Sequence, residues 1–181
     1  LRRAGWGDGV DLVLVNHAVV PTGLLAAAKR PLNVATDETG LMSVMRTNVG
    51  GAAAVAAVTL PLLERRAGSI AFVGSVGAFM PAVGLGAYGV SKLALLGFAD
   101  ALRLELQLAK SNVSVTFVVL GQVQTEQLAE KFSGGASFQD DWVRSLTPAE
   151  AARQILCVAQ RRVRLAYVPW TSLLEASFVA D

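Results

Sequence analysis

Cysteine and histidine, the side chains that most often bind transition metals, occur once each in the 181 residues, as Cys157 and His17. A lone cysteine forms no disulfide within its own chain, and one histidine without thiolate neighbours predicts no metal site. Because Cys157 stands in an apolar run, we expect a buried and inert thiol. His17 follows a predicted strand, and we expect a polar group near a ligand cleft rather than a catalytic base.

Charge of either sign is also scarce. Charged side chains make up 17% of the chain, and sixteen basic against fourteen acidic residues leave a formal net charge of +2. This small excess does not provide the basic surface that nucleic-acid binding requires, so we expect no nucleic-acid partner. The arginines at 161, 162 and 164 are expected to form a solvated face rather than a phosphate or membrane patch.

The sequence lacks an apolar run long enough to cross a bilayer. The best candidate, residues 49–63, has fifteen residues, whereas a span needs roughly twenty. We therefore expect no transmembrane segment in this chain. Its first residues, LRRAGWGDG, match neither a signal peptide nor an anchor and start without methionine, so we expect the chain to begin inside a longer protein.

Apolar residues are abundant, at 53% of the chain, which excludes intrinsic disorder. They gather in short runs rich in β-branched residues, such as VDLVLV and SIAFV, that alternate with longer helical stretches. This alternation indicates right-handed crossovers and a parallel α/β sheet. The expected strands are 10–15, 69–73, 113–120 and 165–168, and the expected helices are 41–65, 87–110 and 148–160.

Two of these helices carry further information. The third should begin at Thr147-Pro148-Ala149-Glu150, where a capping threonine, a proline at the first position and a glutamate at the third satisfy free amides. Helix 87–110 is apolar on nearly every side, so we expect it to be covered on both faces. The sheet would cover one face, and a second copy of the protein is the simplest candidate for the other.

A loop is expected over residues 131–142, where a glycine pair and separated aromatics follow the third strand. Loops at the carboxyl ends of parallel strands often bind ligands. Several nearby side chains can either line an apolar pocket or belong to the core: Phe79, Met80, Val83, Leu128 and Phe132.

Tyr88 and Lys92 stand four residues apart on a predicted helix, so both project from one face about one turn apart. A nearby ammonium lowers the pKa of a phenol, which can then exchange a proton with an alcohol or carbonyl. The spacing alone is also typical of an ordinary surface pair. Asn16, Asn48 and Ser75 add weight, because each polar group stands at a strand end or inside an apolar helix. Each can be a satisfied cap or turn, but together they predict one cleft.

In their order along the chain these residues resemble the motifs of the short-chain dehydrogenase/reductase family. The strand-end Asn16-His17-Ala18-Val19 resembles the family's NNAG element, and Tyr88-Gly89-Val90-Ser91-Lys92 resembles its Y-x-x-x-K motif. The resemblance runs from about residue 10 to 168 and is closest to the 11-beta-hydroxysteroid dehydrogenase type 1 branch, on the NH pair and the segment VLGQVQTE.

The resemblance implies a Rossmann-like doubly wound parallel sheet and hydride transfer between NAD or NADP, with NADP favoured, and a lipophilic secondary alcohol or ketone, steroid-like in this branch. Tyr88 would exchange the proton, Ser75 would hold the substrate oxygen, Lys92 would lower the Tyr88 pKa and bind the nicotinamide ribose, and Asn48 would hold a water that links Lys92 to solvent. A homodimer is implied as well. The implied catalytic set is Asn48, Ser75, Tyr88 and Lys92, and the implied cofactor-binding set is Asn16, Tyr88, Lys92, Gly121, Val123 and Thr125.

The glycine-rich phosphate turn that opens the family's dinucleotide site is missing. GWGDG, at residues 5–9, precedes a strand instead of following one. We therefore expect residues 1–181 to form a single partial domain, the catalytic part, without the dinucleotide-binding βαβ units. This leaves open a catalytically silent family member that acts as a binding or dimerisation partner.

Three smaller expectations follow from the same comparison with the family. Residues 26–40 resemble an insertion at the rim of the cleft, and Gly74, where serine is common, should slightly loosen the strand end before Ser75. Location stays open between the cytoplasm and the endoplasmic reticulum membrane, which the protein would reach through an anchor outside this chain.

Overall fold

The computed structural model describes residues 8–25, 40–80, 82–125 and 145–169. The expected loop 131–142, most of segment 26–40, Leu128 and Phe132 lie outside these residues. The described part has a parallel sheet in the order β1-β2-β3-β4. Its strands are β1 Leu12–Val15, β2 Ser69–Val73, β3 Ser114–Leu120 and β4 Leu165–Val168. The predicted parallel α/β sheet is therefore confirmed, although β1 and β3 begin slightly later than expected.

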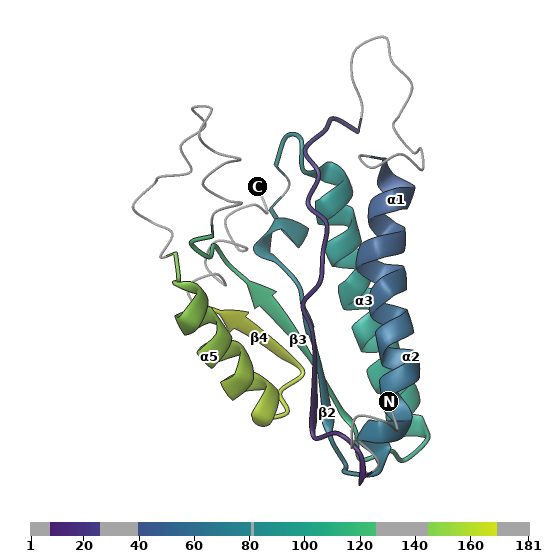
Figure 1. The fold of residues 1–181 in the computed structure, drawn as a ribbon. Coiled ribbons are helices and arrows are strands. Elements are labelled where there is room, and N and C mark those ends of the chain that lie inside the picture. Colours follow the sequence, from purple (N-terminus) through teal and green to yellow (C-terminus); the bar gives the residue numbers. More distant parts are fainter. Residues whose placement is uncertain (1–7, 26–39, 81, 126–144, 170–181) are drawn as a thin grey trace.

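Helices cover both faces of the sheet (Figure 1). One face carries α1 Leu41–Met45, the π-helical turn η3 Arg46–Gly50, α2 Gly51–Glu64 and α3 Gly86–Leu108. The opposite face carries α5 Pro148–Gln160. A short 3-10 turn, η4 Val76–Ala78, connects β2 to the segment that leads into α3. The two-sided covering explains why the central strands β2 and β3 are mostly apolar, since side chains on both of their faces are buried.

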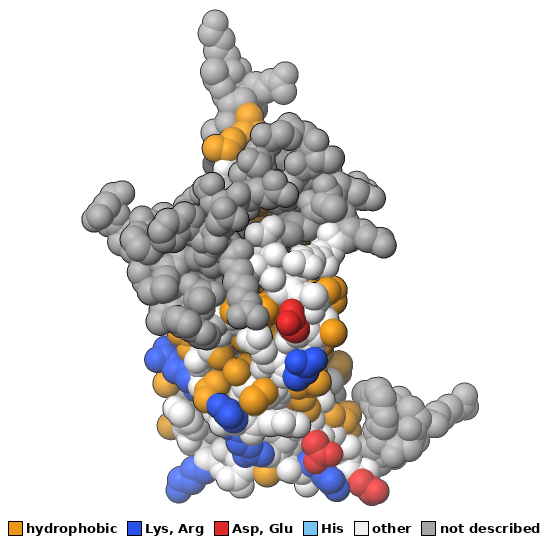
Figure 2. All heavy atoms as spheres, turned by 90° about the vertical axis from the view of Figure 1, so that its left-hand side faces the viewer, with side chains coloured by type: hydrophobic (Ala, Val, Ile, Leu, Met, Phe, Trp, Pro, Cys, Tyr) orange, Lys and Arg blue, Asp and Glu red, His pale blue; other side chains and the backbone are white. Residues whose placement is uncertain are grey.

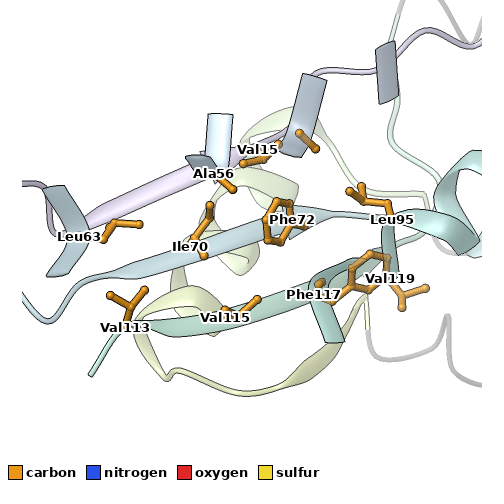
Figure 3. Packing of buried hydrophobic residues seen from close by; sticks show 12 residues of the cluster. Val15, Ala56, Leu63, Ile70, Phe72, Leu95, Val113, Val115, Phe117 and Val119 are labelled. Atoms are coloured by element: carbon orange, nitrogen blue, oxygen red, sulfur yellow. The ribbon is translucent and has the colours of Figure 1, made fainter. Parts of the chain in front are cut away.

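The larger core lies between the sheet and helices α2 and α3 (Figure 3). Ile70 and Phe72 project to this side from β2, which is buried along its whole length. Phe72 meets Phe98 of α3 edge to face, with ring centroids 5.6 Å apart. Val73, the next residue of the strand, joins a second core that packs against α5. The alternation of a strand thus divides its side chains between two cores.

The capping threonine begins α5 as predicted. Thr147 Oγ1 accepts from the Glu150 amide at 3.3 Å, and a Glu150 carboxylate oxygen accepts from the Thr147 amide at 3.0 Å. Pro148 occupies the first turn, where no helical donor is lost. The predicted boundary is confirmed.

Helix 41–65 was expected to be uninterrupted, and the π-helical turn η3 corrects this expectation. Four buried residues in this region, Val44, Asn48, Ala52 and Ala56, are spaced at four residues. A regular α-helix would rotate each of them about 40° further from the one before. The wider π-turn absorbs part of this rotation and keeps the four side chains directed at the sheet and α3.

Cys157 is exposed, so the expected buried thiol is wrong. Helix α5 buries Ala151, Ile155 and Ala159, which repeat at four-residue spacing and form its inner face. Cys157 is two residues beyond Ile155, about 200° around the helix. The apolar run that suggested burial is therefore divided between the two faces of the helix.

The outer face of α3 is exposed in the part of the chain that the structure describes. Val90, Leu93, Leu104 and Leu108 are 45%, 50%, 65% and 85% exposed, and we call them the outer stripe of α3. The expectation that α3 is covered on both faces thus holds within the chain only for the face toward the sheet. Only another molecule or residues outside the described part could cover the outer stripe.

The arginines after α5 are exposed, as expected for a solvated face, but two of them bind other parts of the chain. Arg164 pairs with Asp100 of α3 at 2.9 Å, and Arg162 donates to the carbonyls of Ala67 and Asn112. Figure 2, which looks at the side that carries α5, shows basic side chains scattered among apolar and neutral ones. They form no single patch.

One helix in the described part, Leu41–Glu64, is long and apolar enough to cross a membrane, with a mean hydropathy of 1.3. It is longer than the fifteen-residue run considered in the sequence, so the expected absence of a membrane segment is not confirmed. Ala52, Ala56 and Leu63 of this helix lie in the core against the sheet. Packing of this kind accounts for only part of the apolar composition, since 22% of the most apolar window of the helix is buried.

Candidate active site

Predicted site residues gather at the carboxyl edge of the sheet. Asn16 follows β1, Ser75 follows β2 and Gly121 follows β3, each within two residues of the strand end. Parallel strands bring these positions to one edge, where ligands bind in open α/β sheets. Helix α3 contributes Tyr88 and Lys92 from its first two turns.

Ser75 is held in place by its own turn. It caps η4 in an extended conformation, and its Oγ accepts from the Gly77 amide at 3.1 Å. A hydrogen bond also joins its hydroxyl to the phenol of Tyr88 and lowers the Tyr88 pKa. The larger effect on Tyr88 is burial, which raises its pKa above the usual value. The phenol is thus protonated at neutral pH and lies against Ser75.

Gly89 allows η4 to approach α3 closely. A Cβ atom at Gly89, next to Tyr88, would lie 2.7 Å from the Gly77 carbonyl oxygen. Gly77 itself has room for a Cβ, which would lie at ordinary contact distances, 3.4 Å from Ser75 Oγ and 3.5 Å from the Tyr88 ring. The missing side chain at Gly89 therefore brings the Ser75 hydroxyl within reach of Tyr88. Sequence reasoning passed over Gly89, because its importance depends on a neighbour distant in the chain.

Lys92 is 2% exposed, which is rare for a lysine. Its Nζ donates to the Val73 carbonyl at 2.8 Å and lies 5.7 Å from the centroid of the Tyr88 ring. Burial lowers the Lys92 pKa to about 8, because desolvation disfavours the ammonium. The predicted lowering of the Tyr88 pKa is wrong for this arrangement. Nζ approaches the ring and bonds the end of β2, and desolvation of the phenol dominates.

Asn48 is fully buried in η3, and its carboxamide bonds two other segments. Its Oδ1 accepts from the Val19 amide at 2.8 Å, while Nδ2 donates to the Val19 carbonyl at 3.0 Å and to Ser91 Oγ at 2.9 Å. Both Nδ2 hydrogens are thereby used. The water-holding role of Asn48 stays a prediction, and the two Nδ2 hydrogens are not available to bind that water.

His17 lies near the carboxyl edge, where the sequence placed it. Its Nε2 is 3.2 Å from the Thr47 carbonyl, which can only accept, so Nε2 carries the proton. A Cβ at Gly51 would lie 2.7 Å from the same nitrogen. The imidazole therefore packs on the helix at η3 and α2. This contact gives His17 a structural partner, in agreement with the expectation of a strand-end polar group.

The residues after β3 form a short extended segment. The Gly121 amide donates to the Val168 carbonyl at 2.8 Å, and Val123 forms a parallel bridge with Leu146. Thr125 and Asn16 are exposed. The structure thus places the predicted cofactor residues at the same edge as Tyr88, while the contacts of Gly121 and Val123 are with the rest of the chain.

Gly74 does not loosen the end of β2. Its amide donates to the Val118 carbonyl at 2.7 Å, and the ring of Phe117 occupies the space where a side chain at residue 74 would project. The absence of a Cβ is therefore what lets Phe117 pack beneath the site. The expected loosening is therefore wrong, because the backbone before Ser75 is held by a hydrogen bond and by packing.

Comparisons with known proteins agree with this geometry. The family model described as "short chain dehydrogenase" matches residues 5–135. A hydroxysteroid 11-beta-dehydrogenase 1-like protein of Gallus gallus is 34% identical over 127 residues, or 70% of this chain and 42% of that protein. The human dehydrogenase/reductase SDR family member 2, mitochondrial, is 34% identical over 129 residues, or 71% of this chain and 42% of that protein.

Solved structures show the same fold. A short chain dehydrogenase from Burkholderia cenocepacia, determined in complex with NADP, superposes with a TM-score of 0.75 at 20% identity, over 99% of this chain and 70% of that one. A short chain dehydrogenase from Salmonella enterica has a TM-score of 0.70 at 25% identity, over 91% and 64%. The chain thus spans about two fifths of the length of the curated relatives that it matches.

Proposed function

The chain belongs to the short-chain dehydrogenase family, and we propose that the protein is an NAD(P)-dependent oxidoreductase that acts on a secondary alcohol or ketone. One observation carries the proposal. Tyr88, bonded to Ser75, lies at the carboxyl edge of a parallel sheet beside a buried lysine, Lys92. A buried ammonium beside a half-buried phenol and hydroxyl costs free energy, and such costs are typical of groups that react with a ligand.

In this proposal Tyr88 exchanges a proton with the substrate oxygen, which the Ser75 hydroxyl holds by a hydrogen bond. Burial keeps the Tyr88 pKa high, so the phenol is the form present at neutral pH. A phenol is ready to donate, which favours reduction of a carbonyl at pH 7 and oxidation of an alcohol at higher pH. Lys92, whose Nζ lies over the Tyr88 ring and donates to the Val73 carbonyl, serves in this proposal to hold the cofactor.

The residues present fit the nicotinamide end of the cofactor, whose chemistry is hydride transfer. Lys92 has three ammonium hydrogens, of which one is donated to Val73, and the Tyr88 hydroxyl and exposed Asn16 add further polar groups at the same edge. Lys92 and Tyr88 would hold the ribose hydroxyls, and the segment at Gly121, Val123 and Thr125 would line the nicotinamide. NADP is favoured, because a structural neighbour is described in complex with NADP.

A lipophilic substrate is supported by the segments beside the site. The Gly23 amide donates to the Gly84 carbonyl at 2.9 Å and joins the segment after β1 to the segment before α3. Exposed apolar side chains lie on both: Leu24 is 54% and Val83 94% exposed. Relatives are named hydroxysteroid 11-beta-dehydrogenase 1-like, so a steroid-like alcohol or ketone is the first class to test.

A homodimer is part of the proposal. The outer stripe of α3 is apolar and exposed, and Val58 of the neighbouring α2 is 59% exposed. Burial of apolar area on a second copy would remove both from water. A catalytically silent binding partner is not favoured, because the hydroxyl, phenol and ammonium of the site are all in place.

The proposal is tested by Tyr88→Phe in the full-length protein. We expect turnover to fall by about 10²–10⁴-fold, because the transferable proton is removed, and NADP affinity to fall by a much smaller factor, because Lys92 still holds the ribose. Tyr167→Phe is the matched control, since it removes the same hydroxyl from the chain's other tyrosine, on β4. Retention of more than a tenth of the parent rate by Tyr88→Phe would contradict the assignment.

A further inference from the structure

Ser91 lies between Tyr88 and Lys92 on α3 and is completely buried. Its hydroxyl makes two hydrogen bonds at once. It donates to the Tyr88 carbonyl at 2.7 Å and accepts from Asn48 Nδ2 at 2.9 Å. A serine that only bonded back to its own helix would leave its lone pairs to solvent, whereas here a second segment uses one of them.

The Asn48 bond extends the contact to a third segment. Oδ1 and Nδ2 of Asn48 clasp the amide and carbonyl of Val19, which lies just beyond β1. The resulting chain of bonds runs from the backbone of Val19 through Asn48 and Ser91 to the backbone of Tyr88. It ties together the segment after β1, η3 and the first turn of α3.

The other contacts that orient the first turn of α3 lie on its inner side, among them the approach of Gly89 to Gly77 and the bond from Lys92 to the Val73 carbonyl. Val90 and Leu93 on its outer side are 45% and 50% exposed, so packing fixes the turn from one side only. Rotation of the turn would move Tyr88 away from Ser75 and Lys92 away from the Val73 carbonyl. Since a misplacement of about 1 Å can cost about 10²-fold in rate, a fixed setting matters here.

We propose that Ser91 is a positioning residue, whose buried hydroxyl bonds Asn48 to the Tyr88 backbone and thereby sets the direction of the Tyr88 and Lys92 side chains. Its role in catalysis rests on the proposed function, whereas the link itself does not. Ser91 acts through Asn48 and touches neither of the reacting groups in this scheme.

The test compares Ser91→Ala with Ser69→Ala in the full-length protein. Ser69 is also buried, at 5% exposure, and its Oγ accepts from Ser114 Oγ at 2.7 Å, but it begins β2 at the opposite edge of the sheet. We expect Ser91→Ala to lower kcat tenfold or more, with KM within twofold and a smaller fall in NADP affinity, because Tyr88 and Lys92 also hold the cofactor in the proposed function. Ser69→Ala should leave kcat unchanged even if it lowers the melting temperature. Equal effects of both variants on kcat would overturn the proposal.

Two further variants separate hydrogen bonding from packing. Ser91→Cys fills the same space with a weak donor and acceptor, so it should lose activity as Ser91→Ala does; parent kcat in this variant would overturn the proposal. In an Asn48→Ala background, Ser91→Ala should lower kcat by less than a further twofold, because both changes break the same link. Full additivity of the two losses would contradict action through Asn48.

A readout without activity tests the link even if the protein transfers no hydride. The Val19 amide donates to Asn48 Oδ1, so its hydrogen exchange reports how firmly Asn48 is held. Ser91→Ala should speed exchange at Val19 at least fivefold relative to the parent, and Ser69→Ala should not. Unchanged exchange at Val19 refutes the link. Faster exchange together with an inactive parent protein would support the link and count against the oxidoreductase proposal instead.

Discussion

Gly89→Ala is the most direct test of how the site is assembled. A Cβ at this position would lie 2.7 Å from the Gly77 carbonyl oxygen, whereas ordinary contact begins at 3.4 Å, so η4 must retreat by about 0.7 Å. The Gly77 amide bonds Ser75 Oγ, and the retreat therefore carries the Ser75 hydroxyl away from Tyr88. If 1 Å of misplacement costs about 10²-fold, kcat should fall by roughly 10- to 100-fold.

The assay is steady-state turnover beside thermal unfolding. Alanine is favoured over glycine in a helix by about 0.5–1 kcal/mol, which offsets part of the steric cost to stability. Gly97→Ala is the control, because it lies in the same helix and an added Cβ meets nothing within 4 Å. It should gain stability and keep kcat, with an unchanged mass in sedimentation. Parent activity in Gly89→Ala would show that Ser75 and Tyr88 do not depend on this close approach.

The remaining predictions concern pH, assembly and cofactor binding. The free energy of unfolding should rise by about 2–3 kcal/mol between pH 8 and 10, since unfolded Lys92 keeps its proton to pH 10.5 but folded Lys92 loses it near pH 8. Lys92→Met should lack this rise, and equal slopes would contradict the burial argument. Leu104→Lys with Leu108→Lys should halve the mass seen in sedimentation, whereas Leu156→Lys on α5 should not; an unchanged mass in the double variant places the interface elsewhere. Residues 1–181 alone should show no calorimetric binding of NAD or NADP. The pyrophosphate binds in the crevice between two halves of such a sheet, and the outer edge of β1 has no strand partner in the described part of the chain. Micromolar binding would contradict this.

The strands and the start of α5 could be predicted because their signals are local. Runs of β-branched residues identify buried strands, and Thr147 with Glu150 makes a capping box whose bonds span three residues. The face of Cys157 could also have been predicted, from the four-residue spacing of Ala151 and Ile155 on the same helix. The error there was to weigh composition above helical phase.

The rest depends on contacts between distant segments, which composition does not reveal. Ser91 meets Asn48 across forty-three residues, and Gly89 meets Gly77 between a helix and a turn. Whether the Tyr88 pKa is raised or lowered also depends on how far the fold buries the phenol, because desolvation raises this pKa more than the hydrogen bond with Ser75 lowers it. The sequence spacing of tyrosine and lysine suggests only their proximity.

The π-turn at η3 lets this helix hold one extra residue without changing the faces of its two ends. Residues 46–50 hold one residue more than a regular helical turn needs, so loss of any one of them would restore an unbroken α-helix. Val44 and Ala52 would then be seven residues apart, about 20° short of two full turns, and both would still face the core. Asn48 lies inside the turn, so the contact at risk is its clasp on Val19. We therefore expect homologous chains that lack one residue here to keep this helix on the sheet and to change the bonds made by residue 48.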